Sequence, residues 1–404
     1  MDACGPSSSR ILLRTTSSRC GRTCERVLML QNSRRYQVCS ICVMDNNNPG
    51  VTFDETGQCI CCRDATARKP HEWWPTKEGR ARLEKTVGSI KQEMAGKPYD
   101  VMIGLSGGVD SAYLAHFLKR ELNLRMLAVH VDGGWNTEAA VRNIEKIVRQ
   151  LDIDLYTYVV EWEEMRDLQL AYLRASVLNQ DTPQDHAFFS TLYRLAHRYG
   201  QRYFMNGVNF SSESIHVPDG GYPAMDGRNV RAIHKAHGTA PLRTFPLMGT
   251  LQYLWLVRAR GQVQILKPLN YLPYDKEAAK RLLMDEYGFV DYGSKHQESR
   301  FTKFYQEIYL PSRYSFDKRR LHYSALIVAG QMTRDEALAQ LQQPLVTEEQ
   351  AARDKRFVAK KLGITVSELE RLVALPPVLH ESFANNALLY RLNHSLKKLW
   401  AGRR

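Results

Sequence analysis

The hexapeptide SGGVDS at residues 106–111 limits the possible folds of this chain more than any other segment. It follows an apolar run at residues 100–105, typical of a buried strand. It leads into residues 110–121, where apolar side chains recur at helical spacing. The two glycines let the backbone turn with positive φ and approach an anion closely. Because a helix start offers unpaired N–H groups and a positive dipole end, the segment predicts a cradle for phosphate oxygens.

Three side chains of this turn can add to the cradle. The hydroxyls of Ser106 and Ser111 can donate to phosphate, whereas Asp110 would repel a bare phosphate and is predicted to hold Mg²⁺. The GxxxxGK[ST] pattern of a Walker loop is missing. The string instead resembles the PP-loop of the N-type ATP pyrophosphatases, which implies that these residues bind ATP: Ser106, Gly107, Gly108, Val109, Asp110 and Ser111. The alternative is an ordinary strand–helix turn, because Gly-Gly pairs are common in turns.

Strand and helix patterns alternate through the first half of the chain. Apolar runs predict further strands at residues 125–131, 155–160 and 203–207. Helical spacing predicts the helices between them, at residues 137–151, 165–174 and 184–199. Such alternation is typical of right-handed crossovers and a parallel sheet covered on both faces, so we predict an α/β fold. The residues expected on the buried face of helix 137–151 are Val141, Ile144, Ile147, Val148 and Leu151.

The alternation ends beyond residue 218, where helical patterns dominate. The expected helices are residues 249–260, 276–287, 364–372 and 386–400. We therefore divide the chain into a disordered tail (1–35), a four-cysteine module (36–66), a helical connector (67–98), an ATP-binding domain (99–275) and a mostly helical C-terminal region (276–404).

The PP-loop resemblance also implies roles for the ends of two strands. The end of the second strand contacts adenosine in these enzymes, and the end of the fourth strand lies beside the nucleotide. The residues at these positions are His130, Val131 and Asp132, and Asn206 and Gly207. For the polar side chains, the alternative is ordinary hydrogen bonding at the end of a strand.

The cysteines form a compact pattern ahead of this domain. Cys39-x₂-Cys42 and Cys59-x₂-Cys62 are separated by sixteen residues, which is the spacing of a structural zinc site with four thiolate ligands. An iron–sulfur cluster is the alternative, since it also binds four thiolates. Cys61 is surplus and could compete with Cys62. No ligand position is left open for catalysis, so the module is expected to stabilise the fold or to dock a partner.

The other cysteines of the chain, Cys4, Cys20 and Cys24, precede this module, and none follows Cys62. Disulfides across the main domain are therefore impossible, which fits a reducing compartment. A glutaminase needs a cysteine nucleophile, and the main domain has no cysteine. If the chain is one of the PP-loop enzymes that form amides or amidines, its ammonia must therefore come from outside the chain. No apolar run approaches the ~20 residues that span a bilayer. We expect a soluble, cytoplasmic protein.

The formal net charge of +13 is concentrated at the two ends of the chain. Residues 1–37 and residues 390–404 each carry +5, which leaves +3 for everything between. A basic surface attracts nucleic acid without specificity. Charged ends are more often solvated, so we do not expect a nucleic-acid partner.

Several longer segments resemble one family within the PP-loop superfamily. They are YDVMIGLSGGVDSAYLAHFLK, LAVHVDGGWNTEAAVRNIEKI, YGSKHQESRFTKFYQEIYLPSRYSFDKRRLH and the cysteine segment CSICVMDNNNPGVTFDETGQCICC. Together they resemble the N-acetyl sugar amidotransferases. The resemblance implies that ATP activates the acetamido group of a nucleotide sugar or nonulosonic acid as an O-adenylyl imidate, which ammonia converts to an acetamidino group. Such sugars enter O-antigen, capsule or flagellin glycans, and the implied partners are a HisH-like glutaminase and, in some systems, a HisF-like subunit.

This chemistry needs charge neutralisation and a base near the triphosphate. The catalytic candidates besides Asp110 are Lys295, His296 and Glu298, and further cations are Arg300, Lys303, Lys318, Arg319 and Arg320. The alternative for this basic run is a solvated helix face. The candidates for contacts with the substrate are Trp135, Asn136, Asn209 and Glu213, with Asp185 and His186 at a helix start. For the segment that contains Trp135 and Asn136 the alternative is a capped helix start. For Asn209 it is ordinary hydrogen bonding at the end of a strand.

Two other functions remain open at this point. A tRNA-thiolating PP-loop enzyme would use the zinc module and the basic ends to hold RNA. A non-enzymatic adaptor would keep the fold and the metal site without turnover of ATP.

Overall fold

The computed structural model describes residues 35–48, 50–218, 221–256, 263–291, 293 and 297–390. Contacts divide the chain into residues 1–35 and one compact unit of residues 36–404. The predicted tail therefore falls almost entirely outside the described residues. In the described parts of the chain, no helix is long and apolar enough to cross a membrane.

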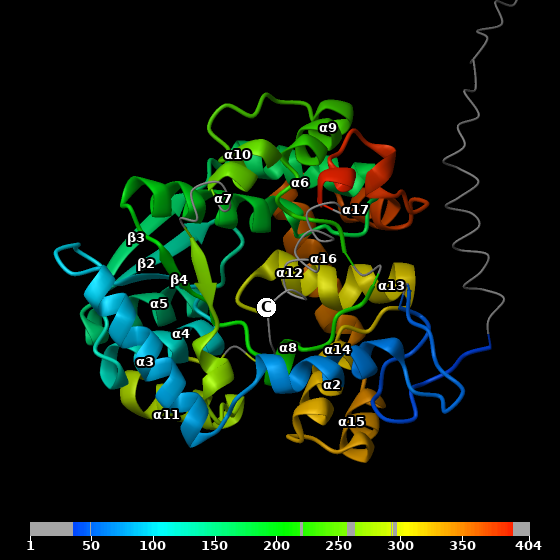
Figure 1. Cartoon of the computed structure of the whole chain (residues 1–404). Coiled ribbons are helices and arrows are strands. Elements are labelled where there is room, and N and C mark those ends of the chain that lie inside the picture. The colour runs from blue at the N-terminus through cyan, green and yellow to red at the C-terminus, as the bar shows by residue number, and fades with distance from the viewer. Residues whose placement is uncertain are drawn as a thin grey trace, which may run out of the picture. The chain divides into compact units, whose positions relative to one another are not determined.

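The strands of the described residues form one parallel sheet in the order β3-β2-β1-β4-β5 (Figure 1). They are β1 (Val101–Gly104), β2 (Met126–Asp132), β3 (Asp154–Val159), β4 (Tyr203–Met205) and β5 (Gln264–Leu266). The predicted α/β fold with a parallel sheet is confirmed. The sequence did not predict β5, because this edge strand contains Gln264 and is largely exposed, so it gives no continuous apolar run.

Helices cover both faces of the sheet. Figure 1 shows α3 (Lys77–Glu93), α4 (Val109–His116), α5 (Glu138–Leu151) and α11 (Lys276–Tyr287) on one side. The other side carries α6 (Trp162–Ala175), α7 (Thr182–Arg198), α9 (Gly227–His237) and α10 (Thr250–Leu254). Neighbouring side chains of β1 enter opposite cores, since Val101 and Ile103 pack in the first and Met102 in the second.

One part of the predicted helix face is wrong. Ile144, Ile147 and Leu151 are buried as expected, but Val141 is 48% exposed. The buried stripe of α5 is centred on Ala140 and Ile144, which leaves Val141 at its rim.

The C-terminal region is helical, as predicted. Its helices in the described residues are α12 (Arg300–Phe304), α13 (Leu310–Tyr314), α14 (Arg319–Ala329), α15 (Arg334–Leu341), α16 (Glu348–Leu362) and α17 (Val366–Val373). A five-residue π-helical segment, Tyr305–Tyr309, joins α12 to α13. The cysteine module leads into α2 (Ile60–Glu72), while the end of predicted helix 386–400 lies outside the described residues.

A short backbone seam joins this region to the sheet. Asn136 and Ser299 form an antiparallel bridge. The Thr137 N–H donates to the Glu298 carbonyl at 2.9 Å, and the Arg300 N–H donates to the Trp135 carbonyl at 2.8 Å. The segment after β2 therefore fixes the segment that opens α12.

Glu164 of α6 anchors the loop that follows α9. Its carboxylate accepts hydrogen bonds from the N–H groups of Arg243, Thr244 and Phe245 at 2.6 to 3.0 Å. Burial alone would raise the pKa of Glu164, but these N–H groups lower it below its usual value.

We predict that Glu164→Gln lowers the free energy of unfolding by about 1.5–3 kcal/mol near neutral pH, because hydrogen bonds to a charged group are lost. The pKa of Glu164 is lower in the folded state than in the unfolded state, so the stabilisation by its carboxylate is complete above the unfolded-state pKa. It disappears as the pH falls through the folded-state pKa. Urea denaturation from pH 7 to pH 3 should therefore show the two proteins converging in acid. The control is Glu163→Gln in the same helical turn, where the exposed pair with Arg166 contributes less than about 1 kcal/mol. An equal effect of both substitutions would contradict the anchoring role.

Candidate functional site

The PP-loop turns between β1 and α4 under tight steric control. Gly107 has φ +82°, and a Cβ added there would lie 2.5 Å from the Ala140 carbonyl oxygen of α5. The hydroxyls of Ser106 and Ser111 lie 3.2 Å apart, and the Gly108 N–H donates to Ser106 Oγ at 3.2 Å. The turn is therefore closed on itself at the N-terminal end of α4, as a phosphate cradle requires.

Asp110 is held in the first turn of α4 by Tyr274. The Tyr274 hydroxyl donates to Asp110 Oδ1 at 2.5 Å. Burial and the charge of Asp110 raise the pKa of Tyr274 well above its usual value, so the phenol keeps its proton. Gly207 lets the end of β4 come close, since a Cβ there would lie 3.3 Å from the Asp110 carbonyl. A carboxylate beside the loop fits a Mg²⁺ ligand for the triphosphate.

Three adjoining cavities surround this loop. The loop cavity, of about 280 Å³, is lined by Ser106, Gly108, Val109, Asp110, Ser111, Asn206, Gly207, Glu213 and Lys276, among others. The strand-end cavity, of about 400 Å³, is lined by Leu105, His130, Val131, Asn136, Asp181 and Tyr222, among others. The helix cavity, of about 900 Å³, lies along α14 and α15. The loop and strand-end cavities share Ser106, Asp185, Phe188 and Glu298, while Val109 and Lys276 also border the helix cavity.

His130 joins the ends of β1 and β2. Its Nδ1 lies 2.9 Å from the Leu105 carbonyl, and its Nε2 lies 3.1 Å from Asn136 Nδ2. Burial lowers the pKa of His130, so the ring is neutral, with Nδ1–H donating and Nε2 accepting. Asn136 also donates to Asp132, which lines none of these cavities and caps the Gly134 N–H. The structure thus brings His130, Val131 and Asn136 to the strand-end cavity.

The predicted residues after β4 divide into two groups. Asn206, Gly207 and Glu213 line the loop cavity. Asn209 is 2% exposed and caps α8 (Phe210–Glu213) by accepting from the Ser212 N–H at 3.0 Å. The Asn209 side chain therefore stabilises the start of α8, and Asn209 lines none of the three cavities.

The structure does not bring Trp135 to the cavities. The ring is 1% exposed, and it lies 5.3 Å from Trp162 and 5.0 Å from Phe301. Lys361 of α16 lies over both tryptophan rings and donates to the Gly134 carbonyl. Trp135 is therefore part of the core that backs the seam.

The predicted basic run is mostly committed to ion pairs. Lys303 pairs with Asp354 at 2.7 Å and Arg319 pairs with Asp317 at 2.7 Å, although both line the helix cavity. Arg300 lies over the Phe357 ring. Arg320 turns toward the cysteine module. Lys318 lines both the strand-end and the helix cavity.

The outcome differs for the three predicted catalytic residues of this run. Lys295 and His296 lie outside the described residues. Glu298 lines the loop and strand-end cavities, as Ser106 does, and its carbonyl accepts from the Thr137 N–H in the seam.

Acidic side chains on the strand-end cavity were only partly predicted. Burial and the charge of Asp185 raise the pKa of Asp181 to about 8. Asp185 faces the open cavity, where solvent reaches it, but protein surrounds its other sides and raises its pKa to about 6. His186 is buried, and its ring lies 2.7 Å from the Ala224 carbonyl and accepts from the Met248 N–H, so it supports the fold.

The sequence did not predict roles for Lys276, Tyr274 and Asp181. Asp275 caps α11, which marks Lys276 as the first residue of that helix. No local pattern indicates that this helix start faces the PP-loop 165 residues earlier in the chain.

The four predicted cysteine ligands come together. The Sγ atoms of Cys39, Cys42, Cys59 and Cys62 all lie within 4.8 Å of one another, and Cys61 is not part of the group. Two of the Sγ pairs are 3.5 and 3.6 Å apart, close to the roughly 3.8 Å edge of a tetrahedron with Zn–S bonds of about 2.3 Å. N–H groups of Ile41, Cys42 and Cys62 donate to these sulfurs, as thiolates require. The donor set fits one zinc ion.

Two family models match the chain on the two sides of the seam. The NAD synthase model matches residues 82–181, which contain the whole PP-loop. The model described as LPS biosynthesis protein WbpG-like, C-terminal domain, matches residues 298–397 and begins at Glu298. The chain is a PP-loop superfamily protein with a WbpG-like C-terminal domain. The predicted family is thereby confirmed, and the combination is consistent with an N-acetyl sugar amidotransferase.

Solved structures give weaker similarities, and no curated protein matches the sequence. An NH3-dependent NAD synthetase from Campylobacter jejuni is 14% identical, with 67% of this chain and 99% of that chain covered and a TM-score of 0.31. The U34-tRNA thiolase NcsA from Methanococcus maripaludis, with its [4Fe-4S] cluster, is 14% identical, with 77% and 90% covered and a TM-score of 0.30. Because both TM-scores lie below 0.5, we infer neither activity nor cofactor from them.

We predict that Gly107→Ala lowers the affinity for ATP at least about tenfold, because a Cβ would push the loop away from α5. Gly96→Ala is the matched control, since Gly96 has φ +79° and no atom within 4 Å of an added Cβ. Both variants carry the strain of positive φ, about 1–2 kcal/mol, and only Gly107→Ala carries the clash. Isothermal titration calorimetry with ATP and Mg²⁺ measures the difference. Equal affinities in the two variants would exclude a role for the close approach.

We predict that Trp135→Ala lowers the free energy of unfolding by about 3–5 kcal/mol, because it removes a buried ring. Trp255→Ala, at a ring that is 43% exposed, should cost less than about 1 kcal/mol. Urea denaturation provides both values. A stable Trp135→Ala protein with an impaired KM for the sugar would instead support the role as a substrate contact.

Proposed function

We propose that this protein is an ATP-dependent amidotransferase that converts the acetamido group of a nucleotide sugar or nonulosonic acid to an acetamidino group. One observation carries the proposal. Side chains of the WbpG-like domain, Glu298 and Lys318, line cavities that adjoin the PP-loop. A nucleotide loop and a glycan-related domain therefore build one site.

The reaction consumes ATP, ammonia and the acetamido sugar, and it involves no oxidation or reduction. The acetamido oxygen attacks the α-phosphorus of ATP, the bond to the β-phosphate breaks, and pyrophosphate leaves. Ammonia then adds to the imidate carbon, and the carbon–oxygen bond to AMP breaks. The products are the acetamidino sugar, AMP and pyrophosphate. Activation is needed because an amide carbonyl is a poor electrophile.

The PP-loop would hold the phosphates through its N–H groups and the hydroxyls of Ser106 and Ser111. Mg²⁺, bound through Asp110, would neutralise charge on the triphosphate. Lys276 and Lys318 stand at the borders between the cavities and can neutralise the charge that develops on the departing pyrophosphate. The strand-end cavity, with His130, Val131 and Asn136, would hold the adenosine part.

The helix cavity suits a sugar. Its lining includes six glutamines, whose amides donate and accept hydrogen bonds as hydroxyl groups require: Gln297, Gln306, Gln331, Gln340, Gln343 and Gln350. Val109 and Lys276 connect this cavity to the PP-loop. We assign the acceptor to this cavity.

Ammonia must react in its unprotonated form, although ammonium predominates at neutral pH. Glu298 and Asp185 line both the loop and the strand-end cavity, so either carboxylate can take a proton from ammonium beside the activated carbon. The pKa of Asp185, about 6, is close to the value that favours a general base at neutral pH. Because no cysteine follows Cys62, a separate HisH-like glutaminase, with a HisF-like subunit in some systems, is the proposed source of ammonia.

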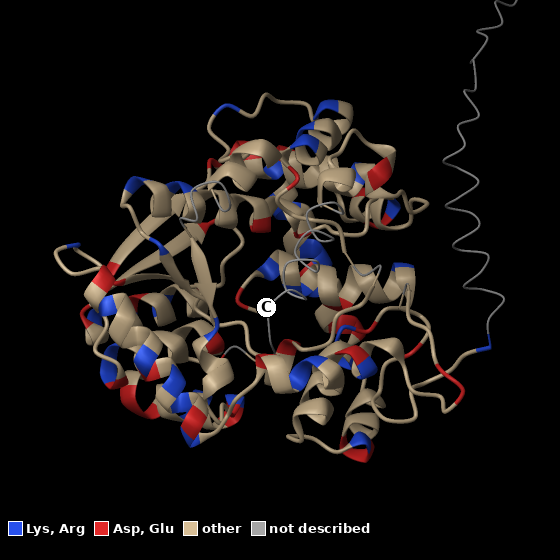
Figure 2. Ribbon diagram, in the orientation of Figure 1, with Lys and Arg blue, Asp and Glu red and all other residues tan. Residues whose placement is uncertain are grey.

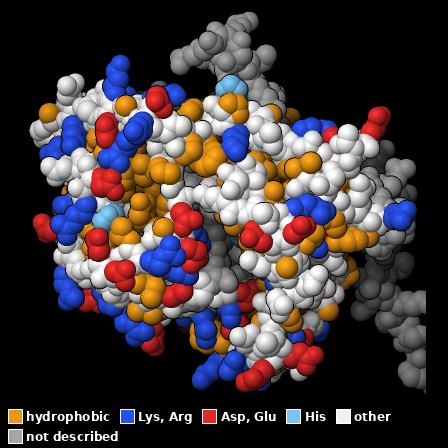
Figure 3. Space-filling view, turned by 90° about the horizontal axis from the view of Figure 1, so that it is seen from below, with side chains coloured by type: hydrophobic (Ala, Val, Ile, Leu, Met, Phe, Trp, Pro, Cys, Tyr) orange, Lys and Arg blue, Asp and Glu red, His pale blue; other side chains and the backbone are white. Residues whose placement is uncertain are grey.

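A tRNA-thiolating activity is the competing function. In the described residues, Lys and Arg side chains are interspersed with Asp and Glu over the helices in Figure 2 and on the face in Figure 3, so neither view supports a basic RNA-binding surface there. We propose instead that the protein acts in the cytoplasm on a precursor of O-antigen, capsule or flagellin glycans, with zinc in the cysteine module.

The test is incubation with ATP, Mg²⁺, ammonium and UDP-linked N-acetyl sugars, followed by mass spectrometry. We expect one oxygen of the sugar to be replaced by NH, with AMP and pyrophosphate formed in equal amounts. Asp110→Asn should lower kcat by about 10²–10³-fold, while Glu121→Gln, in an exposed surface pair with Arg80, should not change it. Pyrophosphate release that requires tRNA and not the sugar would favour thiolation. No ATP turnover with either would favour an adaptor.

A further inference from the structure

Two opposite faces of helix α14 make different contacts. Arg319, His322, Tyr323 and Leu326 recur at helical spacing and line the helix cavity. The opposite face, with Leu321, Ala325 and Val328, packs in one apolar cluster with the four metal-site cysteines. The same helix therefore walls a cavity on one side and contacts the cysteine module on the other.

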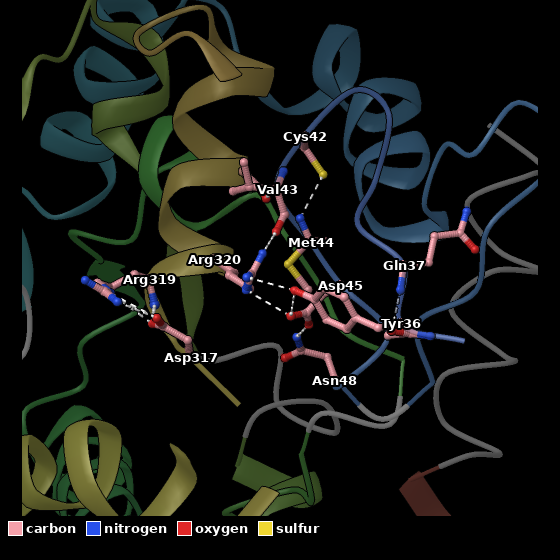
Figure 4. A network of polar contacts seen from close by, with 12 residues as sticks. Tyr36, Gln37, Cys42, Val43, Met44, Asp45, Asn48, Asp317, Arg319 and Arg320 are labelled. Atoms are coloured by element: carbon pink, nitrogen blue, oxygen red, sulfur yellow. Dashed lines mark hydrogen bonds and ion pairs between the residues drawn. The ribbon is translucent and has the colours of Figure 1, made fainter. Parts of the chain in front are cut away.

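Arg320 makes the polar part of the second contact (Figure 4). Its Nε lies 2.9 Å from Asp45 Oδ2, and its Nη1 donates to the Val43 carbonyl at 2.7 Å. Asp45 is 2% exposed and also accepts from Asn48 at 2.8 Å. Figure 4 shows the neighbouring Arg319 turned away from this network and paired with Asp317.

A second arginine repeats the connection from the next helix. Arg334, the first residue of α15, donates to the carbonyls of Cys39 at 2.9 Å and Cys42 at 3.1 Å. The same helix contributes Gln340 to the helix cavity. Val43, between Cys42 and Asp45, donates its N–H to Ser324 Oγ of α14 at 3.2 Å.

The carbonyls that these arginines bind belong to the turn that carries two of the metal ligands. The Cys39 N–H donates to the Met44 carbonyl at 2.8 Å, which closes the turn around the sulfurs. A metal ion that holds Cys39 and Cys42 together would fix the orientation of the Cys39, Cys42 and Val43 carbonyls. The ion would also join this turn to Cys59 and Cys62, whose Sγ atoms lie within 4.8 Å of those of Cys39 and Cys42.

We propose that the metal in the cysteine module positions α14 and α15 through Arg320 and Arg334, and so shapes the wall of the helix cavity. The inference rests on the proposed function only in taking this cavity as the site of the acceptor sugar. Arg320 and Arg334 are positioning residues, because neither lines a cavity around the PP-loop.

Hydrogen–deuterium exchange of the full chain tests this proposal without a substrate. Removal of the metal with a chelator should speed exchange in residues 319–329 at least about tenfold, while α5, on the far side of the PP-loop, keeps its protection. Arg320→Gln should also speed exchange in residues 319–329 while the metal stays bound. Metal analysis of the variant checks that the metal is retained. Arg320→Lys should rescue only in part, since lysine cannot bind the carboxylate and the carbonyl as a fork. The matched control is Arg63→Gln, in the exposed pair with Asp54 on the same module, which should leave α14 protected.

Kinetics separate this inference from the proposed function. With a UDP-linked N-acetylhexosamine as the acceptor probe, Arg320→Gln should raise the acceptor KM about tenfold and leave the KM for ATP within about twofold. Unchanged exchange in α14 after both metal removal and Arg320→Gln would overturn the inference, whatever the reaction proves to be. Faster exchange in α14 without any turnover of the probe would support the inference and would show that this sugar is not the acceptor.

Discussion

The backbone seam between residues 135–137 and 298–300 is the interaction on which the site depends. It attaches the first residue of the WbpG-like domain to the segment that leaves β2, one strand away from the PP-loop. Each amide hydrogen bond contributes only about 1 kcal/mol net, but the buried Trp135 ring beneath the seam adds hydrophobic stabilisation. Without this pairing, Glu298 and Thr302 would not close the strand-end cavity.

Close packing on glycine provides the second constraint. Gly107 against α5 and Gly207 against the first turn of α4 bring three elements of the chain to one point. Polar side chains add two further connections near the PP-loop. His130 ties β2 to the end of β1, and Tyr274 ties Asp110 to the segment before α11. A site built from such rigid elements can be preorganised for charge that develops during the reaction.

Local patterns in the sequence predicted the parts of this site that are short and chemically specific. The hexapeptide, the cysteine pairs and the early strands each carry their signal within about twenty residues. The sequence could not separate a tryptophan that binds substrate from one that packs in a core, and Trp135 packs in a core. It also could not separate Asn209 as a ligand from Asn209 as a helix cap. Lys276 and Arg320 gain their positions from contacts with distant segments, and the exposed edge strand β5 lacks the apolar run of a buried strand.

The proposed reaction requires that the acetamido oxygen attacks the α-phosphorus of ATP in the cradle formed by the PP-loop. The most direct test is an acceptor sugar with ¹⁸O in its acetamido group, incubated with the protein, ATP, Mg²⁺ and ammonium. Mass spectrometry of the nucleotide product then follows the label. We expect the label to be recovered in AMP, with none in pyrophosphate or water. Unlabelled AMP, or label released to water, would show that the oxygen never bonds to the α-phosphorus and would contradict the proposed reaction.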